Sequence, residues 1–442
     1  MNLREGQPMT RKVAIIGGNR IPFARSNGRY ANASNQDMLT STIDGLVSRF
    51  HLQDERLGMV AAGAVLKHSR DFNLTRECVL GSHLASDTPA FDIQQACGTG
   101  LAAAIQVADA ISLGRIDSGI AGGVDTTSDA PIALNDDLRK LLIKASTAKT
   151  TGQRLKLLGK IRPQLLVPEQ PRNGEPRTGL SMGDHAAITA REMGISRQQQ
   201  DEFAASSHQK LAAAYDEGFF DDLITPYLGL SRDNNLRPDS TVEKLSKLKP
   251  VFGKKDAERH GVRATMTAGN STPLTDGASA VLLASEDWAE QHNLPVRAHL
   301  VDSETAAVDF VHGRGRLTPD GLLMAPTYAV PRLLRRNGLT LQDFDFYEIH
   351  EAFASQVLAT LAAWESPEYC SQRLGLDEPL GAIDRSKLNV KGSSLAAGHP
   401  FAATGGRLLA TAAKLLEQKG SGRALVSICA AGGQGVTAIL ER

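Results

Sequence analysis

A chain of 442 residues is long enough for two or three packed units, each with ample apolar surface to bury. Its 49 basic and 49 acidic side chains cancel, which argues against a nucleic-acid-binding protein and against an acidic disordered chain. The four cysteines are too few for a disulfide framework, and no apolar stretch predicts a signal peptide or a membrane span. We therefore expect a reducing, cytoplasmic location.

Strands and helices alternate in the first part of the chain, which indicates an α/β fold. The glycines that end the first strand lack the complete G-x-G-x-x-G pattern, so a nicotinamide or flavin site is not expected. The residues from Phe91 onward predict a strand that leads into a sharp turn at Cys97. The expected elements are strands at 12–18, 59–66, 91–96 and 118–125 and helices at 37–50, 78–85 and 100–113.

A similar order of elements recurs near the end of the chain and suggests an internal duplication. Residues 389–393 would be the strand, His399 lies in the following loop, an alanine-rich helix is expected over 403–417, and a strand over 424–428 ends at Cys429. The stretch between the two halves is rich in charged residues and helix formers, and 184–215 reads as two helices that are broken near 194–196. This middle stretch is interpreted as an insertion.

The insertion contains a basic amphipathic segment, 138–167, which has eight lysines and arginines and no acidic residue. Such a segment can lie on an anionic surface or bind phosphates. A solvated helix face that covers the core is an equally good interpretation.

Cys97, His399 and Cys429 lie in three separate glycine-rich segments, and together they indicate acyl transfer by a thiol. A cysteine at a strand-to-helix turn lies near free N–H groups of the helix, where its pKa is lowered. His399 lies between Gly398 and Pro400, in a loop suited to holding an imidazole beside a sulfur. The second thiol would transfer a proton to or from carbon or sulfur. No metal-ligand spacing is found.

The chain resembles the thiolases along nearly its whole length. The resemblance rests on Arg20-Ile21-Pro22-Phe23, the Cys97 segment, Gly122-Gly123-Val124-Asp125, Ser181-Met182-Gly183, the segment 267–278, His350-Glu351-Ala352-Phe353, Gly398-His399-Pro400 and the Cys429 segment. It implies a thiolase-like five-layer αβαβα fold of two similar halves with an inserted, mainly helical loop domain. The implied division is an N-terminal half at 1–129, completed by about 262–288, a CoA-binding loop domain at 130–261 and a C-terminal half at 289–442.

The resemblance also implies the reaction and its residues. Cys97 would attack the 3-keto carbonyl of a 3-ketoacyl-CoA, His399 would activate it, and Cys429 would protonate the departing acetyl-CoA carbanion and then deprotonate the incoming CoA. His399 and His350, through a water, would stabilise the enolate oxygen, and N–H groups of Cys97 and the Cys429 loop would stabilise the oxyanion at the acyl carbon. Coenzyme A is a substrate here, and no tightly bound cofactor is expected. The residues implied for CoA are Ser181, Met182, Ala268 and Thr272, with Arg237 a candidate for the phosphates.

Two positions depart from many thiolases, which carry Asn at the position of His350 and Gly at that of Ala431. The His350 segment and the basic insertion instead resemble thiolase β-subunits of bacterial fatty-acid β-oxidation complexes, which pair with a hydratase/dehydrogenase α-subunit. The resemblance implies acyl-CoA and CoA as substrates, a homodimer or homotetramer and such an α-subunit as a partner. Peripheral membrane contact is one of the alternatives that the basic segment leaves open, and no nucleic acid is expected.

Three alternatives stay open at this point. A biosynthetic acetoacetyl-CoA thiolase would use the same residues in the condensing direction. A non-catalytic lipid-binding or scaffold protein on the same fold would be expected to lack one of Cys97, His399 and Cys429, and none is missing. A condensing ketosynthase would use two histidines around its cysteine, where Cys429 stands in this chain.

Overall fold

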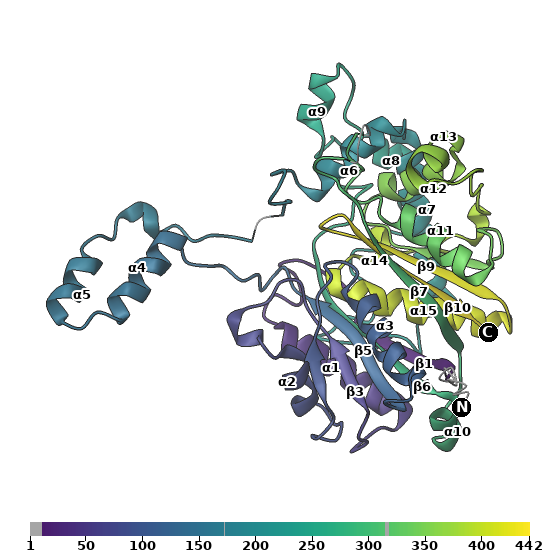
Figure 1. Cartoon of the computed structure of the whole chain (residues 1–442), viewed down its shortest axis with the longest axis horizontal. Helices are drawn as coiled ribbons and strands as arrows, with labels where there is room; N and C mark the ends of the chain where they lie inside the picture. Colours follow the sequence, from purple (N-terminus) through teal and green to yellow (C-terminus); the bar gives the residue numbers. More distant parts are fainter. Residues whose placement is uncertain (1–10, 172, 314–317) are drawn as a thin grey trace, which may run out of the picture.

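The computed structural model describes residues 11–171, 173–313 and 318–442, and its strands join into one mixed sheet (Figure 1). The strand order is β4-β3-β5-β6-β1-β7-β10-β9-β8, and β2 pairs with β6. Only three residue pairs join β1 to β7, so this contact connects two sheet halves. The strands are β1 Val13–Arg20, β2 Ala24–Arg25, β3 Met59–Ala62, β4 Ala90–Asp92, β5 Ser118–Asp125, β6 Thr275–Ser285, β7 Ala298–Ala307, β8 Phe346–Ile349, β9 Arg423–Ala430 and β10 Gln434–Glu441.

Helices pack on both faces of each sheet half. They are α1 Asn35–Phe50, α2 Leu74–Gly81, α3 Thr99–Ser112, α4 Asp136–Ser146, α5 Thr151–Leu158, α6 Met182–Glu192, α7 Arg197–Asp216, α8 Val242–Ser246, α9 Lys254–Arg259, α10 Glu286–Gln291, α11 Pro326–Asn337, α12 Ala354–Glu365, α13 Pro367–Tyr369, α14 Ser394–Ala397 and α15 Thr404–Lys419.

The alternation of side chains along β1 shows how the layers are built. Val13 and Ile15 belong to the central core, together with side chains of α3 and α15, whereas Ala14 and Ile16 belong to a second core with α1. Successive strand residues point to opposite faces, so β1 is covered on both sides. A third core joins α11 and α12 to β8 and β9. The five-layer αβαβα prediction is therefore confirmed.

Several predicted elements have different bounds. The strand expected over 59–66 ends at Ala62, and the helix expected over 78–85 begins at Leu74. The strand expected over 389–393 is wrong. Asn389 has φ 45° and Gly392 has φ 73°, and the Asn389 amide donates to the Ile349 carbonyl and the Glu351 carboxylate, so this stretch is a turn fixed by side-chain hydrogen bonds.

The break between α6 and α7 is confirmed. Gly194 has φ 66°, and Ser196 forms a capping box with Gln199 at the start of α7. The basic segment forms the helical hairpin α4–α5, which projects from the body as an arm (Figure 1). The two chain segments that lead into the arm are hydrogen-bonded to each other between Ala133 and Glu169. No helix among the described residues has the length and apolar character needed to cross a membrane.

Candidate active site

Cys97 lies in the tight turn between β4 and α3, as the sequence predicts. The residue before it, Ala96, has φ 46°, a left-handed conformation that is uncommon for a residue other than glycine. The helix that follows is close to the His399 loop, because a Cβ atom on Gly100 would lie 2.6 Å from the Ala402 carbonyl oxygen. The glycine therefore allows the two loops, about 300 residues apart in sequence, to meet.

His399 is held by its backbone and by its ring. Its N–H donates to the Thr275 hydroxyl at 2.8 Å, and its Nδ1 is 2.5 Å from the Thr404 hydroxyl. The loop is fixed further by Asp125, a buried carboxylate at the end of β5 that accepts the Ala402 N–H at 2.9 Å. The Nε2 of His399 has no hydrogen-bond partner in the described structure and is left available for chemistry.

His350 follows β8 and is completely buried. Its backbone N–H donates to the Ser427 carbonyl of β9 at 2.8 Å, and its Nδ1 is 2.8 Å from the Ser394 hydroxyl. Its Nε2 is also without a partner among the described residues. Each histidine therefore has one ring nitrogen bonded to a hydroxyl and one free.

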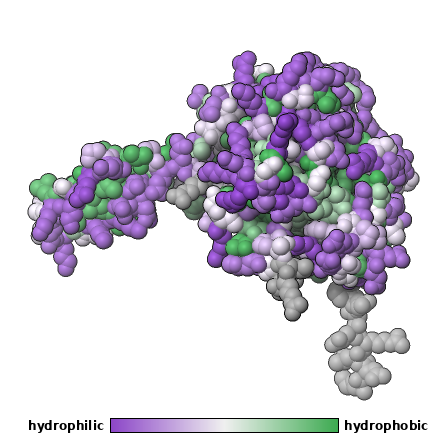
Figure 2. Space-filling model, turned by 90° about the horizontal axis from the view of Figure 1, so that it is seen from above, coloured by the Kyte–Doolittle hydropathy of each residue, from purple (hydrophilic) through white to green (hydrophobic). Residues whose placement is uncertain are grey.

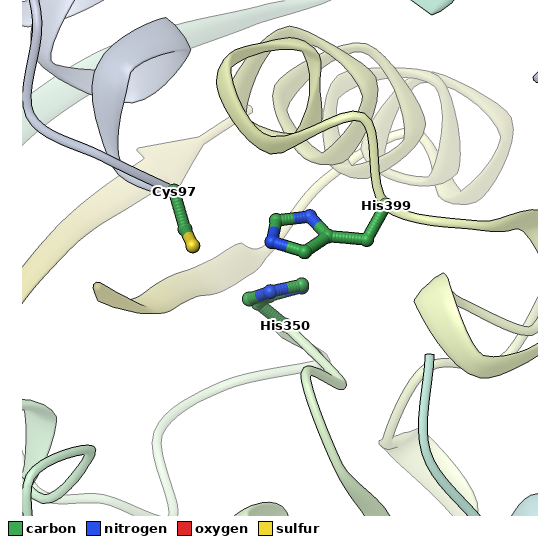
Figure 3. A group of neighbouring side chains, drawn as sticks. All are labelled: Cys97, His350 and His399. Atoms are coloured by element: carbon green, nitrogen blue, oxygen red, sulfur yellow. The ribbon is translucent and has the colours of Figure 1, made fainter. Parts of the chain in front are cut away.

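The three side chains converge (Figure 3). One ring nitrogen of each histidine and the Cys97 sulfur all lie within 4.8 Å of one another, and the ring centroids of His350 and His399 are 4.1 Å apart. The sulfur points toward both imidazoles. The predicted meeting of Cys97, His399 and His350 is present in the structure.

Burial sets the protonation states at rest. It raises the pKa of the Cys97 thiol above its ordinary value, although the N–H groups of Ala431 and of Cys97 itself act against this rise. Burial, together with the Arg407 charge, lowers the pKa of His399 to about 3, and burial, His399 and Arg407 lower that of His350 well below its usual range. The site therefore holds a neutral thiol and two neutral imidazoles. The expectation that the helix N-terminus lowers the Cys97 pKa is wrong, because the cost of burial exceeds the effect of these N–H groups.

Cys429 lies near the end of β9, is 2% exposed and packs in an apolar cluster with Met266 and Phe353. Burial raises its pKa well above the ordinary value, and the neighbouring Cys97 raises it further. The second thiol is thus close to the first and is protonated at rest, as is required of a general acid that protonates a carbon atom.

The turn after Cys429 carries the N–H of Ala431 to the Cys97 sulfur. This turn is tied to a residue that the sequence analysis did not identify, since the buried Glu175 carboxylate accepts the Gly432 N–H at 2.6 Å. Ala431 stands where many thiolases have glycine, and its amide still reaches the nucleophile. A buried glutamate in the insertion has no signal of its own in a single sequence.

The residues implied for CoA lie in two groups and one separate position. Ser181 caps α6, and Met182 packs against the cluster around Cys429. The Thr272 hydroxyl donates at 3.0 Å to the carbonyl of Ala352, which lies two residues after His350. Ala268 is exposed and lies in the same segment as Thr272, 267–278. Arg237 is exposed, and its guanidinium donates to three carbonyls of its own turn.

The cysteine and the two histidines are also of the types that bind zinc. A catalytic zinc site takes three protein ligands and a structural one takes four, so the number of ligands does not by itself assign this group. We interpret the cluster as a nucleophile with its acid–base and oxyanion partners. Two histidines beside a cysteine also suit a condensing ketosynthase, so the presence of Cys429 is what separates the two kinds of site.

Comparisons with known proteins agree with the geometry. The family description "Thiolase, N-terminal domain" matches residues 13–287, and "Thiolase, C-terminal domain" matches residues 304–442. The 3-ketoacyl-CoA thiolase of Pectobacterium carotovorum subsp. carotovorum (strain PC1) is 38% identical over 436 residues, which cover 97% of this chain and 96% of that protein. The protein of the same name from Yersinia enterocolitica is also 38% identical, with 97% of each chain covered.

Solved structures give the same result. The acetyl-CoA acetyltransferase of Bacillus anthracis superposes with a TM-score of 0.79 at 26% identity, covering 98% of this chain and 100% of that one. Human mitochondrial 3-ketoacyl-CoA thiolase in complex with CoA gives 0.76 at 27% identity, with 98% of both chains covered. With both halves of the fold matched and the thiol chemistry in place, the chain belongs to the thiolase family and is an acyltransferase.

Proposed function

We propose that the protein cleaves 3-ketoacyl-CoA with CoA to give acetyl-CoA and a shortened acyl-CoA, in the degradative direction of fatty-acid β-oxidation. The convergence of Cys97, His350 and His399, with Cys429 beside them, is the observation that carries this proposal. The full-length similarity to two bacterial 3-ketoacyl-CoA thiolases supports the choice of substrate.

In the first half-reaction the Cys97 sulfur attacks the C3 carbonyl while the free nitrogen of His399 takes its proton. The N–H groups of Cys97 and Ala431 stabilise the oxyanion that forms at C3. The C2–C3 bond then breaks and its electrons pass to the acetyl-CoA enolate, whose oxygen faces His350 and His399. The Cys429 thiol protonates the enolate carbon, and acetyl-CoA leaves.

In the second half-reaction the Cys429 thiolate takes the proton of the CoA thiol. The CoA thiolate attacks the thioester carbonyl on Cys97 and releases the shortened acyl-CoA. The Cys97 thiolate finally recovers its proton from the His399 imidazolium. Charges and protons balance over the cycle, and neither cysteine is oxidised or reduced.

CoA is proposed to lie along Ser181, Met182, Ala268 and Thr272, because these residues flank the Cys429 cluster and the segment after His350. Arg237 is proposed for the CoA phosphates on its charge and exposure alone, and it would have to exchange carbonyl bonds of its own turn for phosphate. The loop-domain boundaries 130–261 rest on the same assignment.

A biosynthetic acetoacetyl-CoA thiolase is the main alternative, and the similar Bacillus anthracis structure is an acetyl-CoA acetyltransferase. Thiolysis assays with purified protein on 3-ketoacyl-CoA substrates of four to sixteen or so carbons separate the two. We expect kcat/KM to be higher for medium or long chains than for acetoacetyl-CoA. Activity confined to acetoacetyl-CoA would support the biosynthetic role, and no turnover with any chain would support a lipid-binding or scaffold protein.

We also propose that the α4–α5 arm contacts an anionic membrane. On the arm, hydrophobic (green) and hydrophilic (purple) side chains stand side by side (Figure 2). Amphipathic basic helices bind such surfaces through both kinds of side chain. The exposed apolar residues of the arm and the segments leading to it are Ile132, Leu134, Leu142, Ile143, Leu155, Leu158, Leu166 and Val167.

Cosedimentation with vesicles tests this contact. We expect binding to vesicles that contain phosphatidylglycerol, weaker binding to pure phosphatidylcholine, and loss of binding in the double variant Ile143→Ser/Leu155→Ser. Leu113→Ser, which changes an exposed leucine outside the arm, serves as the control. Equal binding of the double variant and the wild type would refute the proposal, and binding only to CoA or phosphate would assign the arm to the substrate.

The remaining proposals concern assembly and location. We propose a homodimer or homotetramer and a hydratase/dehydrogenase α-subunit as a partner, which light scattering and copurification test. A cytoplasmic location is supported by the four free cysteines, Cys78, Cys97, Cys370 and Cys429.

A further inference from the structure

Two adjacent imidazoles with the same surroundings would both be able to act as the base, so the structure must give them different roles. Both Nδ1 atoms contact a hydroxyl, but the two hydroxyls differ in their other partners. The Thr404 hydroxyl has no further hydrogen bond in the described structure. The Ser394 hydroxyl also contacts Arg407, whose Nη2 lies 2.7 Å from the Ser394 oxygen.

Arginine has only N–H donors, so the Ser394 oxygen must accept from Arg407. The hydroxyl proton of Ser394 then has one acceptor among the described residues, the Nδ1 of His350 at 2.8 Å. The opposite arrangement, with Nδ1–H donating to Ser394, would leave a buried hydroxyl proton without an acceptor, which is unfavourable. His350 therefore carries its proton on Nε2, the atom that faces the site without a protein partner.

The position of Ser394 is fixed by the residues on both sides of it. The N–H of Ser393 donates to the Ser207 hydroxyl at 3.1 Å, and the N–H of Leu395 donates to the Glu351 carboxylate at 3.1 Å. All of these side chains are completely or almost completely buried. The Arg407–Ser394–His350 chain is thus held rigidly and shielded from water.

We propose that Ser394 and Arg407 are positioning residues that fix His350 as a neutral Nε2–H donor, which excludes His350 as the base for the Cys97 proton. This inference rests on the proposed function and assigns separate tasks within it. His350 donates directly to the enolate oxygen of acetyl-CoA.

The matched pair Ser394→Ala and Ser393→Ala tests the inference. Both serines accept from the same Arg407 nitrogen, at 2.7 and 3.1 Å, but only Ser394 contacts His350. Two readouts separate the two histidines. Hydrogen–deuterium exchange at the acetyl-CoA methyl reports enolate formation, and the alkylation rate of Cys97 by iodoacetamide reports the Cys97–His399 pair.

We expect Ser394→Ala to slow methyl exchange and to lower kcat by roughly tenfold or more, as expected when an oxyanion donor loses its fixed proton. Its KM for CoA, its Tm and its Cys97 alkylation rate should stay close to the wild type. Ser393→Ala should resemble the wild type in all of these. Exchange unchanged in Ser394→Ala, or equal losses in exchange and alkylation, would overturn the inference.

The protonation state can be observed without any turnover. In protein labelled with ¹⁵N-histidine, a long-range ¹H–¹⁵N correlation spectrum should show His350 with an unprotonated Nδ1, with His350→Asn providing the assignment. The Ser394→Ala variant should lose this preference. If the wild type cleaves no 3-ketoacyl-CoA, the proposed function fails and this spectrum alone decides the inference. A protonated Nδ1 on His350 in the wild type refutes it in either case.

Discussion

Replacing Glu175 by alanine removes the carboxylate that accepts the Gly432 N–H and so releases the turn that brings Ala431 to Cys97. A hydrogen bond to a charged group contributes about 1.5–3 kcal/mol. We expect the loss on Glu175→Ala to lie at the lower end of this range, because Gly432 is exposed and water can replace part of the hydrogen bond. About 1.5 kcal/mol corresponds to a roughly tenfold loss of kcat/KM for thiolysis.

The assay compares Glu175→Ala with Glu175→Gln, whose amide oxygen still accepts the N–H. The glutamine variant should lose no more than about threefold, which corresponds to a neutral hydrogen bond replacing a charged one. Because the Ala431 amide serves the acyl carbon and not the enolate, methyl exchange of acetyl-CoA should stay near the wild-type rate in both variants. Equal losses in both variants, or a loss of exchange that matches the loss of thiolysis, would refute the assigned role of Glu175.

Three further predictions follow from the protonation states and roles in the site. Cys97→Ala should fold with an unchanged Tm and lose nearly all turnover, since the acyl group is carried on Cys97 while Cys429 acts as the acid–base group. Normal thiolysis would exclude Cys97 as the nucleophile. Cys429→Ala should still be acylated at Cys97, but hydrogen–deuterium exchange at the acetyl-CoA methyl should slow by about a hundredfold, as expected for loss of a general acid–base group. An unchanged exchange rate, measured by mass spectrometry, would contradict the role assigned to Cys429. Burial raises the pKa of Cys97 and lowers that of His399 to about 3, so the thiolate fraction is small at neutral pH and the iodoacetamide rate should rise roughly tenfold per pH unit between 7 and 9. A plateau in that rate between pH 6 and 8 would instead show a thiolate–imidazolium pair.

The order and type of most elements near the site could be predicted from hydrophobic pattern and helix signals. The strand before Cys97, the helix after it and the helix break at 194–196 are examples. The turn at Asn389 could not, because its conformation depends on hydrogen bonds to Ile349 and Glu351, about forty residues away. The direction of the Cys97 pKa was also beyond a local argument, since it depends on how completely the folded chain surrounds the sulfur.

The sequence by itself determined which chemistry is present, because a thiol nucleophile, an imidazole and a second thiol are visible in their glycine-rich segments and together match one family. Only the tertiary structure decided which hydroxyl and which charge each imidazole contacts. These partners come from other segments, Ser394 from α14 and Arg407 from α15 for His350, and Thr404 for His399. A hydrogen-bond chain of this kind has a direction only when all of its members are packed together, and it therefore arises from the fold.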